Sequence, residues 1–149
     1  MELEKEIKQK KFSSERAKAH LNILFTGNWL NNLNNKFFKE YGLSSQQYNV
    51  LRILRGKHPE KIMLGDIQCR MLDRMSNASR LVDKLVLRGL VMRQESEGDR
   101  RKVDIWITQR GLDLLAQIDR NFESVEKSFG NISEEEAAEL NKILDKLRG

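Results

Sequence analysis

The feature of this sequence that most constrains its fold is a short helix followed at once by a hairpin. The apolar residues of this helix follow the i, i+3, i+4 and i+7 spacing that places side chains on one helix face, and they are Ala78, Leu81, Val82 and Leu85. The helix should end at Gly89, because glycine favours the left-handed position after a helix. Two strand-like stretches follow, at residues 90–95 and 103–108. This order predicts a winged helix-turn-helix in a chain that is mainly α with a small β-wing.

The outer face of the expected helix is polar. Short hydrogen-bonding residues lie near its start and long cations lie further along, namely Ser76, Asn77, Ser79, Arg80 and Lys84. A helix that reads the major groove needs this distribution, because its N-terminal residues reach base edges, Asn pairs with adenine and Arg pairs with guanine. An ordinary solvated face is the alternative interpretation, since amphipathic helices have polar outer faces by default.

The hairpin carries cations at or beside its tip. The expected turn residues and the cations after them are Glu97, Gly98 and Asp99, then Arg100, Arg101 and Lys102. A two-stranded ribbon can place a guanidinium group in a narrow minor groove, where the negative potential of DNA is concentrated. An exposed charged loop is the alternative. Because the cations occur together with the preceding polar-faced helix, we favour a wing that binds double-stranded DNA.

At these residues the sequence resembles the MarR family of bacterial transcriptional regulators. The wing pattern of that family is Asp-x-Arg, a short apolar strand that ends in Leu-Thr, and a Gly soon after. The matching residues here are Asp99, Arg100, Arg101, Val103, Ile105, Ile107, Thr108 and Gly111, with Ile107 in place of the usual Leu. The resemblance implies that Arg101 enters the minor groove, that Asp99 holds the wing loop by a local pairing, and that Arg80 belongs to the recognition helix.

The resemblance also implies a homodimer and a small effector. In the family, the first, fifth and sixth helices of two subunits interlock, and aromatic acids or phenols bind in the crevice between these helices and the reading head. Aromatic candidates for lining such a crevice are Phe25, Trp29, Phe37 and Tyr48. They are equally candidates for the hydrophobic core. The sequence does not distinguish repression from activation, and the identity of any effector stays open.

The first helix of the helix-turn-helix is expected at residues 64–72, with the turn at residues 73–75. Arg70 and Arg74 lie beside this turn and are expected to bind phosphate oxygens, contacts that position a protein without reading sequence. The uneven distribution of charge along the chain supports this interpretation. Residues 41–111 hold 14 Lys and Arg against 8 Asp and Glu, whereas residues 112–149 hold 5 against 9. The basic middle is therefore the expected polyanion-binding region.

Amphipathic helices are expected on both sides of this region. One begins near Ser13 and runs to Glu40, and it can bend or end at an Asn-rich segment because Asn has modest helix propensity. A fifth helix is expected after Thr108, with Val125 and Phe129 as its last apolar positions, and a sixth should start at the capping box of Ser133 and Glu136. Within the basic region, a capping box of Ser44 and Gln47 should start another helix. We predict one domain, residues 1–149, with a winged helix-turn-helix at 41–108 and dimerisation helices at 1–40 and 109–149. A helical layer within one chain is the alternative to a dimer.

Enzymatic motifs are missing from the sequence. His20, His58 and Cys69 have no familiar metal-site spacing, and neither a phosphate-binding GxxxxGK[ST] loop nor a GxSxG nucleophile motif occurs. We expect no cofactor and no metal, and we rank oxidant sensing by Cys69 below ligand sensing. There is no apolar run of 18 residues and no signal-like start, so a cytoplasmic location is expected.

The resulting hypothesis is a homodimeric, sequence-specific regulator of transcription, favoured as a repressor, that binds a pseudo-palindromic operator and is released by a small ligand. A winged-helix protein-interaction module without DNA binding is the alternative. The cations on the helix and at the wing favour the first hypothesis, because a module that does not bind DNA has no need of cations at both positions.

Overall fold

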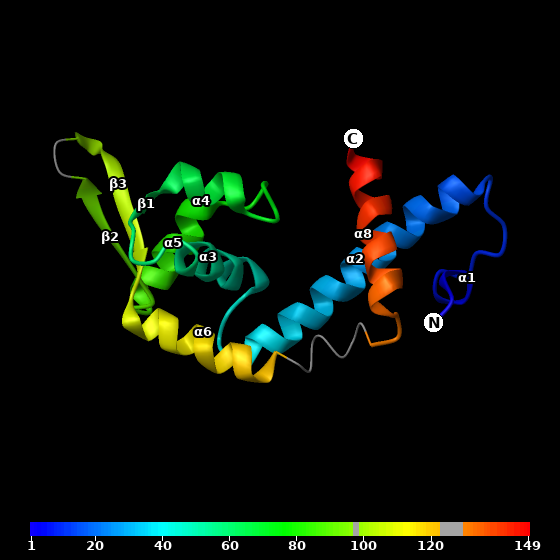
Figure 1. The fold of residues 1–149 in the computed structure, drawn as a ribbon, viewed down its shortest axis with the longest axis horizontal. Coiled ribbons are helices and arrows are strands. Elements are labelled where there is room, and N and C mark those ends of the chain that lie inside the picture. Colours follow the sequence, from blue (N-terminus) through cyan, green and yellow to red (C-terminus); the bar gives the residue numbers. More distant parts are fainter. Residues whose placement is uncertain (97–98, 123–129) are drawn as a thin grey trace.

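The structure is a computed structural model that describes residues 1–96, 99–122 and 130–149. Its helices and strands, in chain order, are α1 (Leu3–Glu6), α2 (Glu15–Lys39), α3 (Ser45–Arg55), β1 (Ile62–Met63), α4 (Leu64–Arg70), α5 (Ala78–Leu87), β2 (Val91–Ser96), β3 (Asp99–Ile107), α6 (Gln109–Asn121) and α8 (Glu134–Arg148). Figure 1 shows a head made of α3, α4, α5 and the two-stranded ribbon of β2 and β3, with α6 along one edge. Helix α2 leads away from this head, and α1 and α8 lie at the opposite end of the molecule (Figure 1).

The expected helix starts are confirmed by their caps. The Ser44 side chain accepts a hydrogen bond from the Gln47 backbone N–H, while the Gln47 side chain accepts one from the Ser44 N–H, which completes a capping box. Thr108 caps α6 through the N–H of Gly111, at 3.1 Å. A second capping box starts α8. The last predicted positions of the fifth helix, Val125 and Phe129, lie outside the described residues.

Helix α2 agrees with the long helix predicted for residues 13–40, and its Asn-rich segment does not interrupt it. The helix continues without interruption to Lys39 instead of bending or ending. The Asn35 carboxamide oxygen accepts hydrogen bonds from the Ser45 hydroxyl at 2.7 Å and from the Ser45 N–H at 3.2 Å. These hydrogen bonds connect the Asn-rich segment to the start of α3. Intrinsic helix propensity alone does not predict a continuous helix through this segment.

The sheet has one more strand than the sequence predicted. Its order is β1-β3-β2, with both pairs antiparallel. Strand β1 is only two residues long, and Ile62 pairs opposite Ile105 of β3. The two strands of the wing agree with the prediction, with Val91 opposite Ile107. Of the expected turn residues, Glu97 and Gly98 lie outside the described part, and Asp99 belongs to β3 rather than to the turn.

The core lies where α3, α5, α6 and the sheet meet. Its fully buried side chains include Leu51, Leu54, Ile67, Leu85, Ile105, Leu115 and Ile118. On α5, Ala78, Val82 and Leu85 are buried and Leu81 is half-buried, as the spacing predicted. Gly89 ends this helix with φ +69°, the left-handed conformation expected there. Within the described residues, no helix is long and apolar enough to span a membrane.

Candidate nucleic-acid interface

The turn of the helix-turn-helix is longer than predicted. Helix α4 ends at Arg70 rather than at Leu72, and Met71 is already extended, with φ −60° and ψ 137°. Helix α5 begins only at Ala78. Ser76 and Asn77 therefore precede the recognition helix instead of lying on its outer face, which corrects the sequence-based placement.

Asn77 is the N-cap of α5. Its side-chain oxygen accepts a hydrogen bond from the Arg80 N–H at 3.1 Å. A bidentate contact with adenine needs both the oxygen and the nitrogen of the carboxamide, so the observed cap competes with that role. Ser76 is half-buried, and its hydroxyl donates to the Asp73 carboxylate at 2.9 Å. Both residues thus shape the start of the helix in this structure.

The two cations of α5 point outward. Arg80 and Lys84 are exposed, and together with Ser76, Asn77 and Asp73 they line a shallow depression that also reaches the start of α3. The structure therefore brings four of the five predicted recognition-helix residues to one surface. The fifth, Ser79, is half-buried and lines a different hollow, between α5 and the ribbon.

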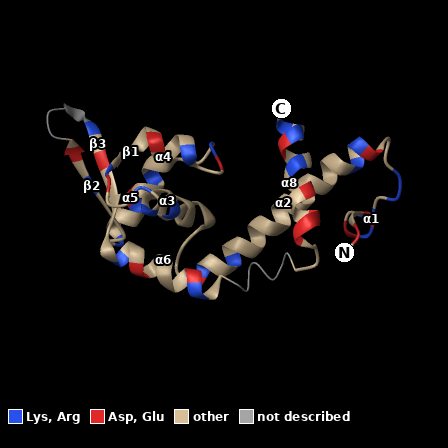
Figure 2. Cartoon of the chain, in the orientation of Figure 1, with Lys and Arg blue, Asp and Glu red and all other residues tan. Residues whose placement is uncertain are grey.

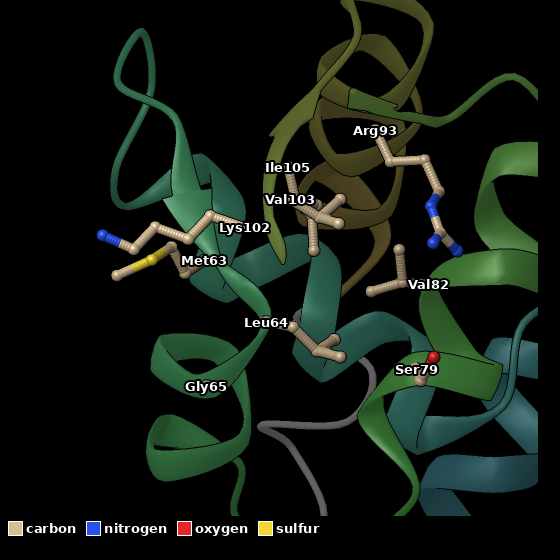
Figure 3. A pocket seen from close by; sticks show the side chains of 9 residues that line it. All are labelled: Met63, Leu64, Gly65, Ser79, Val82, Arg93, Lys102, Val103 and Ile105. Carbon is tan, nitrogen blue, oxygen red and sulfur yellow. The ribbon is translucent and has the colours of Figure 1, made fainter. Parts of the chain in front are cut away.

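That hollow has a volume of about 260 Å³ and separates the recognition helix from the wing (Figure 3). Its apolar walls come from Leu64, Val82, Val103 and Ile105, among others. Arg93 of β2 extends across it toward α5 (Figure 3), where its guanidinium donates to the Asp83 carboxylate in an ion pair. This contact connects the base of the wing to the recognition helix.

The ribbon brings the predicted wing residues to its far end. Asp99, Arg100, Arg101 and Lys102 belong to β3. The side chains of the first three lie outside the described part of the chain, so their predicted roles stay predictions. Lys102 is exposed. In Figure 3 its amino group points away from the hollow that its aliphatic stem helps to line.

Other arginines of the head make contacts within the chain. The Arg88 guanidinium donates to the Gly42 carbonyl at 2.6 Å and to the Tyr41 carbonyl at 3.0 Å. Arg55 forms an ion pair of 2.5 Å with Asp119 of α6. By contrast, Arg70 is exposed at the last residue of α4, and Arg74 is exposed in the middle of the turn that follows. Figure 2 shows basic residues, coloured blue, distributed over the helices and strands of the head.

The pKa of Arg52 is shifted by a neighbouring side chain. Its guanidinium donates to the Tyr48 hydroxyl at 3.1 Å, and this hydrogen bond raises the pKa of Arg52 above its ordinary value. Its partner Tyr48 is buried, so the pair belongs to the packing of α3 rather than to the surface formed by Arg80 and Lys84.

The four aromatic residues predicted to line one crevice do not lie together. Phe25 and Trp29 line a cavity of about 160 Å³ between α1 and α2, with Met1 and Leu3. Phe37 and Tyr48 instead pack in the head, where each ring contacts Phe38 and Phe122. Within this chain, Phe37 and Tyr48 are part of the core, as the alternative interpretation expected, and the other two residues line a separate cavity.

Residues 43–103 match the family model described as MarR family. The crystal structure of a MarR transcription factor from Planctomyces limnophilus is 32% identical in sequence. The match covers 91% of this chain and 98% of that one, with a TM-score of 0.70. The chain belongs to the MarR family. The segment matched by the MarR family model contains the helix-turn-helix and most of the ribbon.

Two further similarities extend the comparison within the MarR fold. The transcriptional repressor MprA of Escherichia coli strain K12 is 29% identical over 84 residues, which are 56% of this chain and 48% of MprA. The match thus spans about half the length of that curated relative. The structure of the S. aureus MepR-DNA complex is 19% identical, covers 92% of this chain and 97% of that one, and has a TM-score of 0.76. This likeness shows a shared fold.

Several supporting residues of the MarR-like head were missed by sequence reasoning. Asp83 and Arg93 are ten residues apart, and only the return of β2 beside α5 brings them together. Asn49 and Gln68 hold the turn through their side chains. The sequence held no signal for Gln68, because the backbone groups that it binds come together only in the folded turn.

Proposed function

We propose that this chain is a homodimeric, sequence-specific DNA-binding regulator of transcription that acts as a repressor. The observation that carries the proposal is the contrast among the cations of the head. Arg70, Arg74, Arg80 and Lys84 are exposed around the helix-turn-helix, whereas Arg88 makes hydrogen bonds within the chain. Exposed cations gathered around a recognition helix release counterions from DNA phosphates and so favour binding. Similarity to the repressor MprA supports the sign of regulation.

In the proposed complex, α5 enters the major groove and the ribbon reaches the minor groove. Arg80 is in position for a bidentate contact with guanine, and Arg70 and Arg74 bind phosphates at the start and in the middle of the turn. Arg101, with its neighbours Arg100 and Lys102, is proposed as the minor-groove contact, and Asp99 as the residue that holds the loop. The ion pair between α5 and β2 keeps the two reading elements in a set relative orientation.

A second subunit is proposed to cover the helices outside the head. Helix α8 has no buried residue in this chain, and Ile143 and Leu147 are 56% and 65% exposed. Leu24 on α2 is 54% exposed. Faces of this kind are stabilised by burial against a partner. We therefore propose residues 41–108 as the reading head and residues 1–40 and 109–149 as the dimerisation region. A two-fold dimer sets its recognition helices about 34–36 Å apart, one turn of DNA.

A small aromatic or phenolic effector is proposed to regulate binding. The cavity lined by Phe25, Trp29 and Leu3 has a volume of about 160 Å³. An apolar cavity of roughly 150 Å³ is large enough to bind benzene. A ligand that binds one spacing of the two heads better than another changes DNA affinity by that difference alone. This function needs no catalytic group, and it would be carried out beside the chromosome in a bacterial cytoplasm.

Selection from a pool of random DNA duplexes at two salt concentrations tests the proposal. We expect an enriched palindrome whose retention falls steeply with salt. Arg80→Ala should relax the preference at one base pair by about 1–3 kcal/mol, whereas Arg101→Ala should weaken binding to all A·T-rich flanks. Lys142→Ala is the matched control, because it removes one exposed cation from α8, outside the head.

Failure of the selection has a definite meaning. If no duplex is enriched and retention does not depend on salt, the proposed function is wrong, and a protein-interaction module becomes the better interpretation. If Arg101→Ala and the unchanged protein bind A·T-rich flanks equally, the wing assignment is wrong even though DNA binding stands.

A further inference from the structure

The turn between α4 and α5 exposes two large apolar side chains. Leu72 is 91% exposed and Met75 is 93% exposed, the highest values among the large hydrophobic residues of the described chain. Removing such side chains from water is favourable. Contact with a partner outside this subunit would therefore bury this apolar surface favourably.

Hydrogen bonds hold the backbone at both of these residues. The Leu72 N–H donates to the Asn49 side-chain oxygen of α3 at 2.9 Å. The Met75 N–H donates to the Asp73 carboxylate at 3.0 Å. Each apolar residue is thus anchored through its own backbone while its side chain points into solvent. A fixed backbone reduces the conformational entropy that binding would otherwise cost.

Gln68 anchors the rest of the turn from α4. Its side-chain nitrogen donates to the carbonyl oxygens of Arg74 and Ser76, both at 2.8 Å. Its side-chain oxygen accepts from the Ala78 N–H at 3.2 Å, at the first residue of α5. The turn and the start of the recognition helix are therefore one hydrogen-bonded unit, and side chains on the turn move with that helix.

Arginines outnumber acids around the pair, where the acidic residue is Asp73, whose carboxylate accepts hydrogen bonds from the Met75 N–H and the Ser76 hydroxyl. Arg70 and Arg74 are exposed next to Leu72 and Met75 in the sequence, and Arg80 is exposed on the first turn of α5. In Figure 1 the turn lies at the right of the head and the far end of the ribbon at its left, and both lie above α6. A partner that covers this surface must carry negative charge around an apolar group. Duplex DNA meets both requirements, because its major groove is bordered by phosphates and contains the C5-methyl group of thymine.

We propose that Leu72 and Met75 read thymine by packing against its C5-methyl group in the major groove. This inference rests on the proposed DNA-binding function and adds a specificity that hydrogen-bonding residues on α5 do not supply. The pair lies just before the N-terminal end of α5, the part of a recognition helix that contacts base edges. Thymine is the only base that offers a methyl group there.

Replacement of thymine by deoxyuridine in the duplex tests this directly, since it removes the methyl group and keeps every hydrogen-bonding atom. The probe is a duplex enriched by the unchanged protein from a random pool, prepared once with thymine and once with deoxyuridine. We expect about fourfold weaker binding for each contacted methyl group that is removed, the equivalent of one buried CH₂. In the double variant Leu72→Ser with Met75→Ser, both duplexes should bind equally.

A matched control is available on the same helix. Leu87 is 87% exposed at the C-terminal end of α5, away from the turn. Leu87→Ser removes a comparable exposed side chain, and we expect it to keep the preference for thymine. All of these side chains are exposed, so the substitutions should leave the fold intact, which circular dichroism of each variant checks.

The outcomes separate this inference from the proposed function. If the protein enriches a duplex but binds its deoxyuridine form equally well, the thymine contact is wrong while DNA binding stands. If the double variant keeps the full thymine preference, the methyl groups are read by other residues and the assignment is overturned. If the double variant dissociates into monomers, the pair belongs to the subunit interface. If no duplex is enriched, the proposed function itself fails.

Discussion

Replacement of Gly111 by alanine should destabilise the protein, although Gly111 lies in a helix, where alanine is ordinarily favoured. A Cβ atom at this position would lie 2.4 Å from the Leu90 carbonyl oxygen and 2.6 Å from a side-chain carbon of Ile107. The carbonyl belongs to the backbone and cannot rotate away, so α6 must move. Such overpacking costs up to about 3 kcal/mol. The gain in helix propensity is about 1 kcal/mol, which leaves a net loss of about 2 kcal/mol.

Thermal and urea denaturation of Gly111→Ala measure this loss. For a protein of this size, about 2 kcal/mol corresponds to a melting temperature lower by roughly 4–8 °C. Gly65→Ala is the matched control, because Gly65 also lies in a helix of the head and a Cβ atom there meets nothing within 4 Å. The control should be neutral or more stable. A Gly111→Ala protein as stable as the unchanged chain would refute the close-approach argument.

Three further outcomes are expected. Leu147→Glu places a charge on the exposed apolar face of α8 and should weaken dimerisation more than about tenfold in sedimentation experiments, and an unchanged dimer would contradict the proposed interface. Asp83→Asn removes the ion pair with Arg93 and should weaken operator binding about two- to fivefold. If the contact positions the wing, the exchanged pair Asp83→Arg with Arg93→Asp should restore operator binding. The hydrogen bond from Lys18 lowers the pKa of Glu4 below its ordinary 4.5. This contact therefore stabilises the docking of α1 fully above pH 4.5, and the stabilisation is lost as the pH falls through the lower pKa that Glu4 has in the folded protein. Hydrogen exchange of α1 should show this loss, and Glu4→Gln should abolish the pH dependence.

The features that sequence predicted well are local ones. The capping boxes at Ser44 and Ser133 each involve residues three positions apart, and both are present. The core face of α5 follows from side-chain spacing on one helix, and the end at Gly89 follows from one backbone preference. In each of these cases the deciding atoms lie within one or two helical turns, so no knowledge of the rest of the fold was needed.

The features that sequence missed depend on contacts between distant segments. Strand β1 is two residues long and has no periodicity of its own, so its pairing with Ile105 is visible only once β3 is in place. The role of Asn77 changed for a related reason. The extended conformation of Met71 lengthens the turn, which shifts the start of α5 and makes Asn77 its N-cap.

The aromatic residues show how one helix can join two sites without placing them together. Trp29 and Phe37 are eight residues apart on α2, about 12 Å along its axis, which is too far for one small ring to contact both. The helix between them is continuous, and Asn35 binds Ser45 at the start of α3. A ligand beside Trp29 that shifts α2 would therefore displace the reading head as well. On this argument Asn35→Ala should leave ligand binding unchanged while reducing its effect on DNA affinity, and equal regulation in the variant would show that the signal takes another route.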